Sequence, residues 1–248
     1  MRAVILAAGR GSRLGPHTED RPKCLVELDH QPLIQRQIAA LRAGGVSTIG
    51  IVRGYLANMI DIPDVTYFEN PRWSETNMVM SLAAASSWLR TDSVVISYAD
   101  IFYEAGVVRD LAASAGDLVV AYDPNWLNLW AKRFDDPLSD AETFRTDAQG
   151  NLIDIGRRTT KIDEIAGQYM GLVRFTPAAW KAIEAVLASV DDKVRDAMDM
   201  TTLLRRLLDS GFQIGTVPIA GQWGEIDSSS DLELYEKMIR EGEFCLEN

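Results

Sequence analysis

A glycine-rich turn follows directly on the first apolar segment of the chain. Residues 2–6 are apolar and partly β-branched, which predicts a short buried strand. The segment LAAGRGSRLG comes next, and Gly9 and Gly11 allow its backbone to approach a ligand and to adopt positive φ angles. The N–H groups of such a turn can hold phosphate oxygens. A chain that starts in this way is expected to fold as an α/β protein with an anion site behind its first strand.

The residues around the turn favour phosphate binding over a plain tight connection. Arg13 supplies a forked cation that suits two phosphate oxygens, and Lys23 supplies a compact charge shortly afterwards. Two familiar motifs are excluded. The P-loop pattern GxxxxGK[ST] is absent, and Leu14 stands where the GxGxxG fingerprint needs its third glycine. We therefore predict a phosphate-binding turn that belongs to neither class.

Apolar segments and helical patterns alternate along the chain. Further strands are expected at residues 25–28, 48–52, 65–68, 93–97, 117–122, 168–175, 214–218 and 223–226, and helices at residues 32–43, 76–88, 106–115, 177–187, 200–208 and 231–240. Thr76 is the expected N-cap of its helix. Residues 142–146 and 152–155 flank a turn signal and are expected to form a hairpin. The pattern predicts an α/β protein with a Rossmann-like, doubly wound mixed sheet and a small β-hairpin-containing lobe on the substrate side.

The domain organisation follows from the lack of any division in the sequence. No internal repeat, low-complexity run or linker separates one part of the chain from another. We expect a single domain over residues 1–248.

The charge and cysteine content limit the partners and the compartment. A formal net charge of -11 makes general binding to nucleic acid or to an anionic membrane unfavourable. Positive charge is instead gathered locally, at Arg10, Arg13, Arg21 and Lys23. Two cysteines form no disulfide framework, and no stretch is long and apolar enough for a signal peptide or a membrane span. These features predict a cytoplasmic protein without nucleic-acid or membrane partners.

Two aspartates follow apolar strands in positions suited to a metal ion. Asp100 comes soon after the strand at residues 93–97, and Asp227 directly follows the strand at residues 223–226. Ligands of open α/β sheets bind outside the carboxyl ends of the strands, and Mg²⁺ takes one or two carboxylates together with waters and substrate phosphates. Glu225 shares a strand face with Asp227 and is the alternative ligand. We expect Mg²⁺ as the cofactor, bound by Asp100 and Asp227.

Longer segments resemble a known family. The turn, followed by RPKCLVEL, is similar to the signature of the sugar-phosphate nucleotidyltransferase superfamily. A narrower branch of that superfamily contains cytidylyltransferases for phosphocholine, 2-aminoethylphosphonate and phosphorylated glutamine. The segments that resemble this branch are NPRWSETNMVMSL, SYADIFYE, YDPNWLNLWAKRFDDPLSDAETF, GQYMGL and QWGEIDSSSDL. The likeness runs from Met1 to about Tyr235, which is nearly the whole chain.

The resemblance implies roles for particular residues. The backbone of Leu6, Ala7, Ala8 and Gly9 would face the nucleoside, and Gly11, Ser12 and Arg13 would hold the β- and γ-phosphates. Lys23 would contact the α-phosphate and the acceptor phosphate, while Asp100 and Asp227 would hold Mg²⁺. Arg13, Lys23, Asp100 and Asp227 are therefore the expected catalytic residues. Thr76, Asn77 and Ala99 complete the expected nucleotide site, with Asn77 as a hypothetical contact of the base.

The resemblance implies that residues 1–122 form mainly the nucleotide-binding half of the domain, and residues 123–248 mainly the acceptor-binding half and a closing helix. The acceptor site is expected among aromatic and charged residues of the second half. Aromatic faces and carboxylates would suit an ammonium group through cation–π contact and ion pairing. Trp126 and Trp130 lie four residues apart, so they equally fit an ordinary hydrophobic helix face. Lys132 and Arg133 either engage the acceptor's phosphate or only solvate a helix. The expected acceptor-binding residues are Tyr122, Trp126, Trp130, Lys132, Arg133, Glu142, Gln168 and Tyr169.

The function predicted from these observations is a Mg²⁺-dependent cytidylyltransferase. Its partners would be CTP and a small phosphorylated or phosphonate acceptor, with pyrophosphate released; a homodimer is left open. One alternative is a sugar-1-phosphate uridylyl- or thymidylyltransferase. Another is a non-catalytic nucleotide-binding regulatory subunit, because folds of this kind can keep a site and lose its chemistry.

Overall fold

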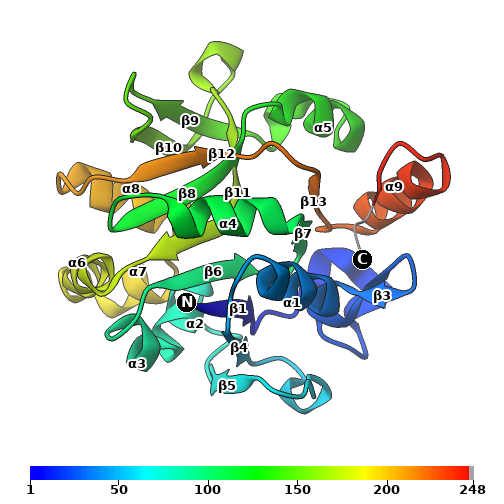
Figure 1. The fold of residues 1–248 in the computed structure, drawn as a ribbon, viewed down its shortest axis with the longest axis horizontal. Helices are drawn as coiled ribbons and strands as arrows, with labels where there is room; N and C mark the ends of the chain where they lie inside the picture. The colour runs from blue at the N-terminus through cyan, green and yellow to red at the C-terminus, as the bar shows by residue number, and fades with distance from the viewer. Residues whose placement is uncertain (246–248) are drawn as a thin grey trace.

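The central feature of the computed structural model, which describes residues 1–245, is a mixed seven-stranded β-sheet (Figure 1). Within these residues the strand order is β12-β8-β11-β6-β1-β4-β5. Only β11 runs antiparallel to its neighbours, and the other pairings are parallel. The strands are β1 (Arg2–Ala7), β4 (Thr48–Arg53), β5 (Thr66–Glu69), β6 (Val94–Tyr98), β8 (Leu118–Asp123), β11 (Gln168–Phe175) and β12 (Gly215–Pro218). The predicted doubly wound mixed sheet is confirmed.

Helices cover both faces of this sheet because alternate side chains of the buried strands point in opposite directions. In β1, Ala3 and Ile5 belong to one apolar cluster, whereas Val4 belongs to another. The first cluster lies under α1 (Leu33–Ala43), α4 (Ala105–Ala113) and α5 (Trp126–Arg133). The second lies under α2 (Met78–Ala84), α3 (Ser86–Leu89), α6 (Pro177–Ala188) and α8 (Met200–Asp209). Figure 1 shows α1 and α4 in front of the sheet.

Smaller sheets lie around the central one. The predicted hairpin is present as the antiparallel pair β9 (Glu142–Thr146) and β10 (Leu152–Arg158). A short antiparallel pair, β2 (Glu27–Leu28) and β3 (Gln31–Pro32), follows the glycine-rich turn. That the hairpin serves the substrate side stays a prediction, as does the division of the single domain into two functional halves.

A further antiparallel pair joins two distant parts of the chain. β13 (Trp223–Glu225) pairs with β7 (Ile101–Tyr103), and the two strands lie side by side in Figure 1. The closing helix α9 (Ser229–Arg240) follows β13 and packs over a third apolar cluster that includes Leu14 and Phe102. The carboxyl-terminal part of the chain is thereby fixed beside the glycine-rich turn. A one-and-a-half-turn helix, α7 (Asp192–Asp196), precedes α8.

Three local predictions are wrong. The helix expected at residues 76–88 is two helices that meet at Ala85, and Asn77 rather than Thr76 is the N-cap of α2. The Asn77 side chain accepts the Met78 N–H at 2.7 Å, whereas the Thr76 hydroxyl donates to the Arg72 carbonyl at 2.8 Å. The strand expected at residues 25–28 is reduced to β2, because a 3₁₀ turn occupies Lys23–Leu25.

Within residues 1–245, no helix combines the length and the hydropathy needed to cross a bilayer.

Candidate active site

The glycine-rich turn packs directly against Lys23. Gly11 has a φ of 69°, a left-handed conformation that favours glycine. A Cβ atom at Gly11 would lie 2.6 Å from Cδ of Lys23. At Gly9, in contrast, a Cβ atom would meet nothing within 4 Å. The close approach of the turn to Lys23 therefore requires glycine at position 11 but not at position 9.

This difference makes Gly11→Ala a test of the turn's geometry. The added methyl group must displace either Lys23 or the turn, and the residue must hold a positive φ. We expect turnover to fall by roughly 10- to 100-fold, since a displacement of about 1 Å at a catalytic group costs on that order. Gly211→Ala, just after α8, is the matched control, because Gly211 also has a positive φ, of 84°, and a Cβ atom there would meet nothing within 4 Å. Gly211 belongs to no predicted site, so this variant should stay close to wild type in initial-rate measurements. Equal rates for the two variants would contradict the account.

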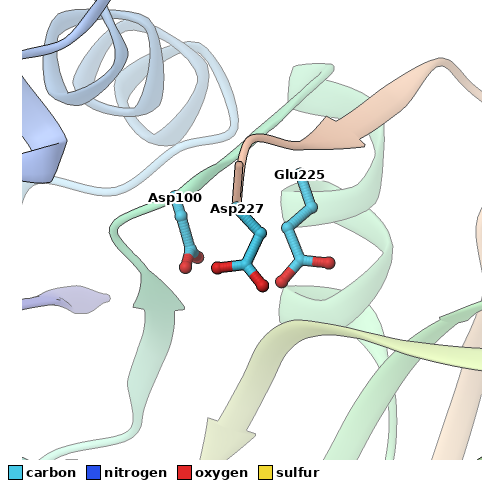
Figure 2. Close-up of side chains that lie close together, drawn as sticks. All are labelled: Asp100, Glu225 and Asp227. Carbon is cyan, nitrogen blue, oxygen red and sulfur yellow. The ribbon is translucent and has the colours of Figure 1, made fainter. Parts of the chain in front are cut away.

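The pairing of β7 with β13 brings three carboxylates together. Glu225 is opposite Ile101 in this pair, and the Ile226 N–H donates to the Asp100 carbonyl at 2.9 Å. Asp100 and Asp227 therefore become neighbours although they are far apart in the sequence. Each of Asp100, Glu225 and Asp227 offers an oxygen, and these oxygens all lie within 4.8 Å of one another. Figure 2 shows the three side chains reaching toward the same space.

Lys23 and Arg13 balance this negative charge. The Lys23 ammonium donates to Asp100 at 2.8 Å and to Asp227 at 2.7 Å, and its side chain is buried. Burial by itself lowers the pKa of Lys23, but the two carboxylates outweigh burial, so that its pKa is raised and the side chain stays charged. Arg13 forms an ion pair with Asp227 from the exposed side. The predicted catalytic residues Arg13, Lys23, Asp100 and Asp227 thus form one cluster.

The cluster fits a divalent cation. Carboxylate oxygens are the ligands that Mg²⁺ prefers. Oδ1 of Asp100 is buried and has no hydrogen-bond partner among residues 1–245, so one ligand atom is left over for an ion. Glu225, the alternative ligand, is the third member of the cluster. Burial, reinforced by the charge of Asp100, raises the pKa of the Glu225 carboxyl to about 7, while Arg133 opposes this shift.

A cavity of about 330 Å³ opens beside the cluster. It is lined by every residue of the predicted nucleotide site, including those of the turn, Thr76, Asn77 and Ala99. The predicted metal ligands Asp100 and Asp227 also line it. The sequence reasoning missed other residues that line it, namely Cys24, Trp73, Met78, Ser81 and Tyr98. Trp73 and Met78 lie in the NPRWSETNMVMSL segment, and Tyr98 ends β6, so their places in the sequence carried a usable signal.

Asn77, the hypothetical contact of the base, already uses its side chain in hydrogen bonds within the protein. The Asn77 side chain accepts the Met78 N–H, and its Nδ2 donates to the Ala197 carbonyl at 3.2 Å. Its backbone N–H donates to the Asp196 carbonyl at 2.7 Å. Asn77 therefore lies at the cavity but is also hydrogen-bonded to the carboxyl-terminal end of α7. A role at the base stays a prediction.

None of the eight predicted acceptor residues lines this cavity, and three of them lie in the interior. Trp126 and Trp130 are buried, and Trp130 packs against Trp223 with ring centroids 6.1 Å apart. The Trp126 indole N–H donates to the Ile165 carbonyl at 3.3 Å. Of the two alternatives for Trp126 and Trp130, the structure shows the ordinary hydrophobic helix face. Arg133, the third of these residues, is also interior, with a side chain only 1% exposed.

The remaining acceptor candidates occupy different places. Lys132 is exposed and pairs with Glu243 at 2.8 Å, and Tyr122 stacks on Phe144 at a centroid distance of 4.8 Å. Gln168 is tied to Glu142, since its amide donates to the Glu142 carbonyl at 2.7 Å. The Tyr169 ring packs edge-on against Tyr98, with ring centroids 5.8 Å apart. Tyr98 lines the cavity, so the Tyr169 ring contacts a residue of the cavity wall.

Cys24 has a packing role. Its side chain is buried in the first apolar cluster, and burial raises the pKa of its thiol to about 12. A thiol in such surroundings is neutral and weakly nucleophilic. Cys24 and Cys245 are both free, so neither forms a disulfide within the described residues.

A mixed α/β sheet with cationic and acidic groups converging at the carboxyl ends of its strands is the arrangement expected of an enzyme that transfers nucleotidyl groups. The comparisons with known proteins agree, and the chain is a nucleotidyltransferase. Residues 3–143 match the family described as the MobA-like NTP transferase domain. The chain belongs to this family of nucleotidyltransferases.

Individual relatives cover the chain to different extents. It is 36% identical to the CTP:phosphoglutamine cytidylyltransferase of Campylobacter jejuni, in a match that covers 94% of this chain and 98% of that enzyme. The choline-phosphate cytidylyltransferase of Streptococcus pneumoniae is 37% identical over 99 residues, which are 38% of this chain and 43% of that enzyme. The inositol-1-phosphate CTP transferase of T. maritima shares the fold, with a TM-score of 0.73, 21% identity and 98% of each chain covered.

Proposed function

We propose that this nucleotidyltransferase is a Mg²⁺-dependent cytidylyltransferase. It transfers CMP from CTP to a small acceptor that carries a phosphate or phosphonate, and it releases pyrophosphate. The observation that carries this proposal is the convergence of Lys23, Asp100 and Asp227 at the wall of the cavity beside the glycine-rich turn. The similarity to cytidylyltransferases supports CTP as the nucleotide and a phosphorylated small molecule as the acceptor.

The chemistry needs no general base. An acceptor phosphate or phosphonate oxygen is already an anion, and it attacks the α-phosphorus as the bond to the bridging oxygen of pyrophosphate breaks. The obstacle is repulsion between two anions and the charge that grows on the leaving pyrophosphate. Bound Mg²⁺ supplies charge neutralisation on the triphosphate.

Two cationic side chains of the protein, Lys23 and Arg13, also counter the repulsion between the anions and the charge on pyrophosphate. Lys23 is buried between the carboxylates, next to the turn, and we infer that it contacts the α-phosphate and the incoming acceptor oxygen. Arg13 is largely exposed at the edge of the cavity, and we infer that it contacts the outer phosphates. Asp100 and Asp227 hold these cations in position and offer oxygens to the metal. Preorganised charges of this kind stabilise a transition state without reorganising during the reaction.

A nucleotide and acceptor panel tests the proposal. Pyrophosphate release is measured with CTP, UTP, dTTP, ATP and GTP, each combined with phosphomonoesters, phosphonates and sugar 1-phosphates. We expect CTP with a small phosphomonoester or phosphonate to be favoured by about tenfold or more, because an unmatched polar edge of a base leaves buried groups without partners. Chelation of divalent metal should lower the rate by about a hundred-fold or more.

The panel also separates the competing functions. Preference for UTP or dTTP with a sugar 1-phosphate would show a sugar-nucleotide enzyme instead. Saturable CTP binding without pyrophosphate release from any acceptor would favour a regulatory nucleotide-binding protein. An unchanged rate after chelation would contradict the metal requirement alone.

A further inference from the structure

Arg133 is a charged side chain in the interior that the proposed chemistry does not use. Its side chain is 1% exposed, at the carboxyl-terminal end of α5. Its Nε donates to Oδ1 of Asp231 in α9 at 2.8 Å, and its Nη1 donates to Oε2 of Glu225 in β13 at 3.1 Å. A buried guanidinium is tolerated only when it is paired and hydrogen-bonded, and here both of its acidic partners flank Asp227.

The first partner controls the backbone at Asp227. Oδ2 of Asp231 accepts the N–H of Asp227 at 3.0 Å and the N–H of Ser228 at 2.9 Å. Ser228 in turn caps α9, with Asp231 as the third residue of a reciprocal capping box. Arg133 holds the other oxygen of the same carboxylate. The Arg133–Asp231 ion pair thus fixes the carboxylate that orients the Asp227 peptide.

The second partner belongs to the acidic cluster itself. Glu225 offers an oxygen within 4.8 Å of those of Asp100 and Asp227, so three carboxyl groups share a small space. Lys23 donates to Asp100 and Asp227, and Arg133 pairs with Glu225. Arg133 therefore restrains Glu225, which Lys23 does not contact by a hydrogen bond among the described residues, and opposes the mutual repulsion of the carboxylates.

We propose that Arg133 is a positioning residue that holds Asp227 and Glu225 in the arrangement that binds the divalent cation. It acts through Asp231 and through Glu225 rather than by touching substrate. This inference rests on the proposed metal site at Asp100 and Asp227. It replaces the expectation that Arg133 contacts the acceptor's phosphate.

The experiment measures metal binding apart from turnover. Mn²⁺ is titrated into protein saturated with CTP and followed by electron paramagnetic resonance, and initial rates and melting temperatures are recorded in parallel. The test variants are Arg133→Lys, whose single ammonium cannot span both partners, and Asp231→Asn, which removes the ion pair but keeps an oxygen for the Asp227 N–H. Asp227→Ala is the reference for loss of the metal site.

A second buried arginine provides the matched control. Arg174 is 6% exposed, and within residues 1–245 its guanidinium donates only to backbone carbonyls, those of Leu111, Ser114 and Gly116. Arg174→Lys therefore disturbs the interior without touching the acidic cluster. It should lower the melting temperature but leave Mn²⁺ affinity within about twofold of wild type.

We expect Arg133→Lys to weaken Mn²⁺ binding by about tenfold or more, the usual effect of losing a group that orients a metal ligand. Asp231→Asn should shift the affinity in the same direction, and kcat should fall while the KM for the acceptor changes little. Wild-type Mn²⁺ affinity in both variants, with binding lost in Asp227→Ala, would overturn the role of Arg133 and leave the metal site standing. So would a rise confined to the acceptor KM, or an equal loss of affinity in Arg174→Lys. Wild-type affinity in Asp227→Ala would reject the metal site and the inference with it.

Discussion

Lys23→Ala is expected to lower turnover by about a hundred-fold or more, on the scale seen when one preorganised electrostatic donor is removed. The Lys23 ammonium lies 2.8 Å from Asp100 and 2.7 Å from Asp227, and no other lysine or arginine among residues 1–245 forms a salt bridge with Asp100. Without it, the acceptor's anion must approach the α-phosphate against uncompensated carboxylate charge. The measurement is kcat for pyrophosphate release at saturating CTP and Mg²⁺.

Stability should change together with turnover in this variant. Breaking a fully buried ion pair costs about 3–5 kcal/mol, and partial exposure of the two aspartates reduces that figure. A fall in melting temperature of roughly 5 °C is expected. Arg21→Ala is the control, because Arg21 is an exposed cation of the same segment that pairs only with Asp20 among the described residues. Near-wild-type turnover in a folded Lys23→Ala protein would defeat the assignment.

Asp100→Ala is expected to lower turnover by a similar factor, about a hundred-fold or more, but for a different reason. The change removes a carboxylate whose Oδ1 is buried and has no partner within residues 1–245. The variant should need a higher Mg²⁺ concentration for half-maximal rate. Rates measured across a Mg²⁺ titration, compared with wild type, check both effects.

This second variant should keep its stability in the absence of metal. Lys23 retains Asp227 as a partner, and one source of like-charge repulsion is removed. The melting temperature without Mg²⁺ is therefore expected to remain within about 4 °C of wild type. Asp61→Ala, at an exposed loop position, is the matched control. An unaltered Mg²⁺ dependence in Asp100→Ala would remove Asp100 from the metal site.

Local patterns predicted the framework well, since each depends on a few neighbouring residues. The apolar run before the glycines became β1, the turn signal at residues 147–150 became the β9–β10 hairpin, and the alternating segments became the sheet and its helices. The ends of the helices and strands were predicted less accurately. Thr76 and Asn77 both suit an N-cap. Asn77 takes that place because its side chain accepts the Met78 N–H, whereas the Thr76 hydroxyl donates to the Arg72 carbonyl.

The acceptor side was the least predictable part. Trp126 and Trp130 show the same spacing whether a helix faces a ligand or the protein interior. The structure buries both. Trp130 packs against Trp223, the Trp126 indole donates to the Ile165 carbonyl, and the Arg133 side chain is buried as well. A residue type and its spacing do not reveal which neighbour will cover it, because that neighbour comes from elsewhere in the chain.

By itself, the sequence determined the first strand, the glycine-rich turn after it and the cations that follow the turn, because backbone conformation and periodicity are local properties. Only the tertiary structure decided that Asp227 would lie next to Asp100. The pairing of β13 with β7 brings Asp227 and Asp100 together. The Arg133–Asp231 ion pair then holds the carboxylate that accepts the Asp227 N–H. Long-range pairing of this kind depends on the summed packing of the whole fold, which no single segment encodes.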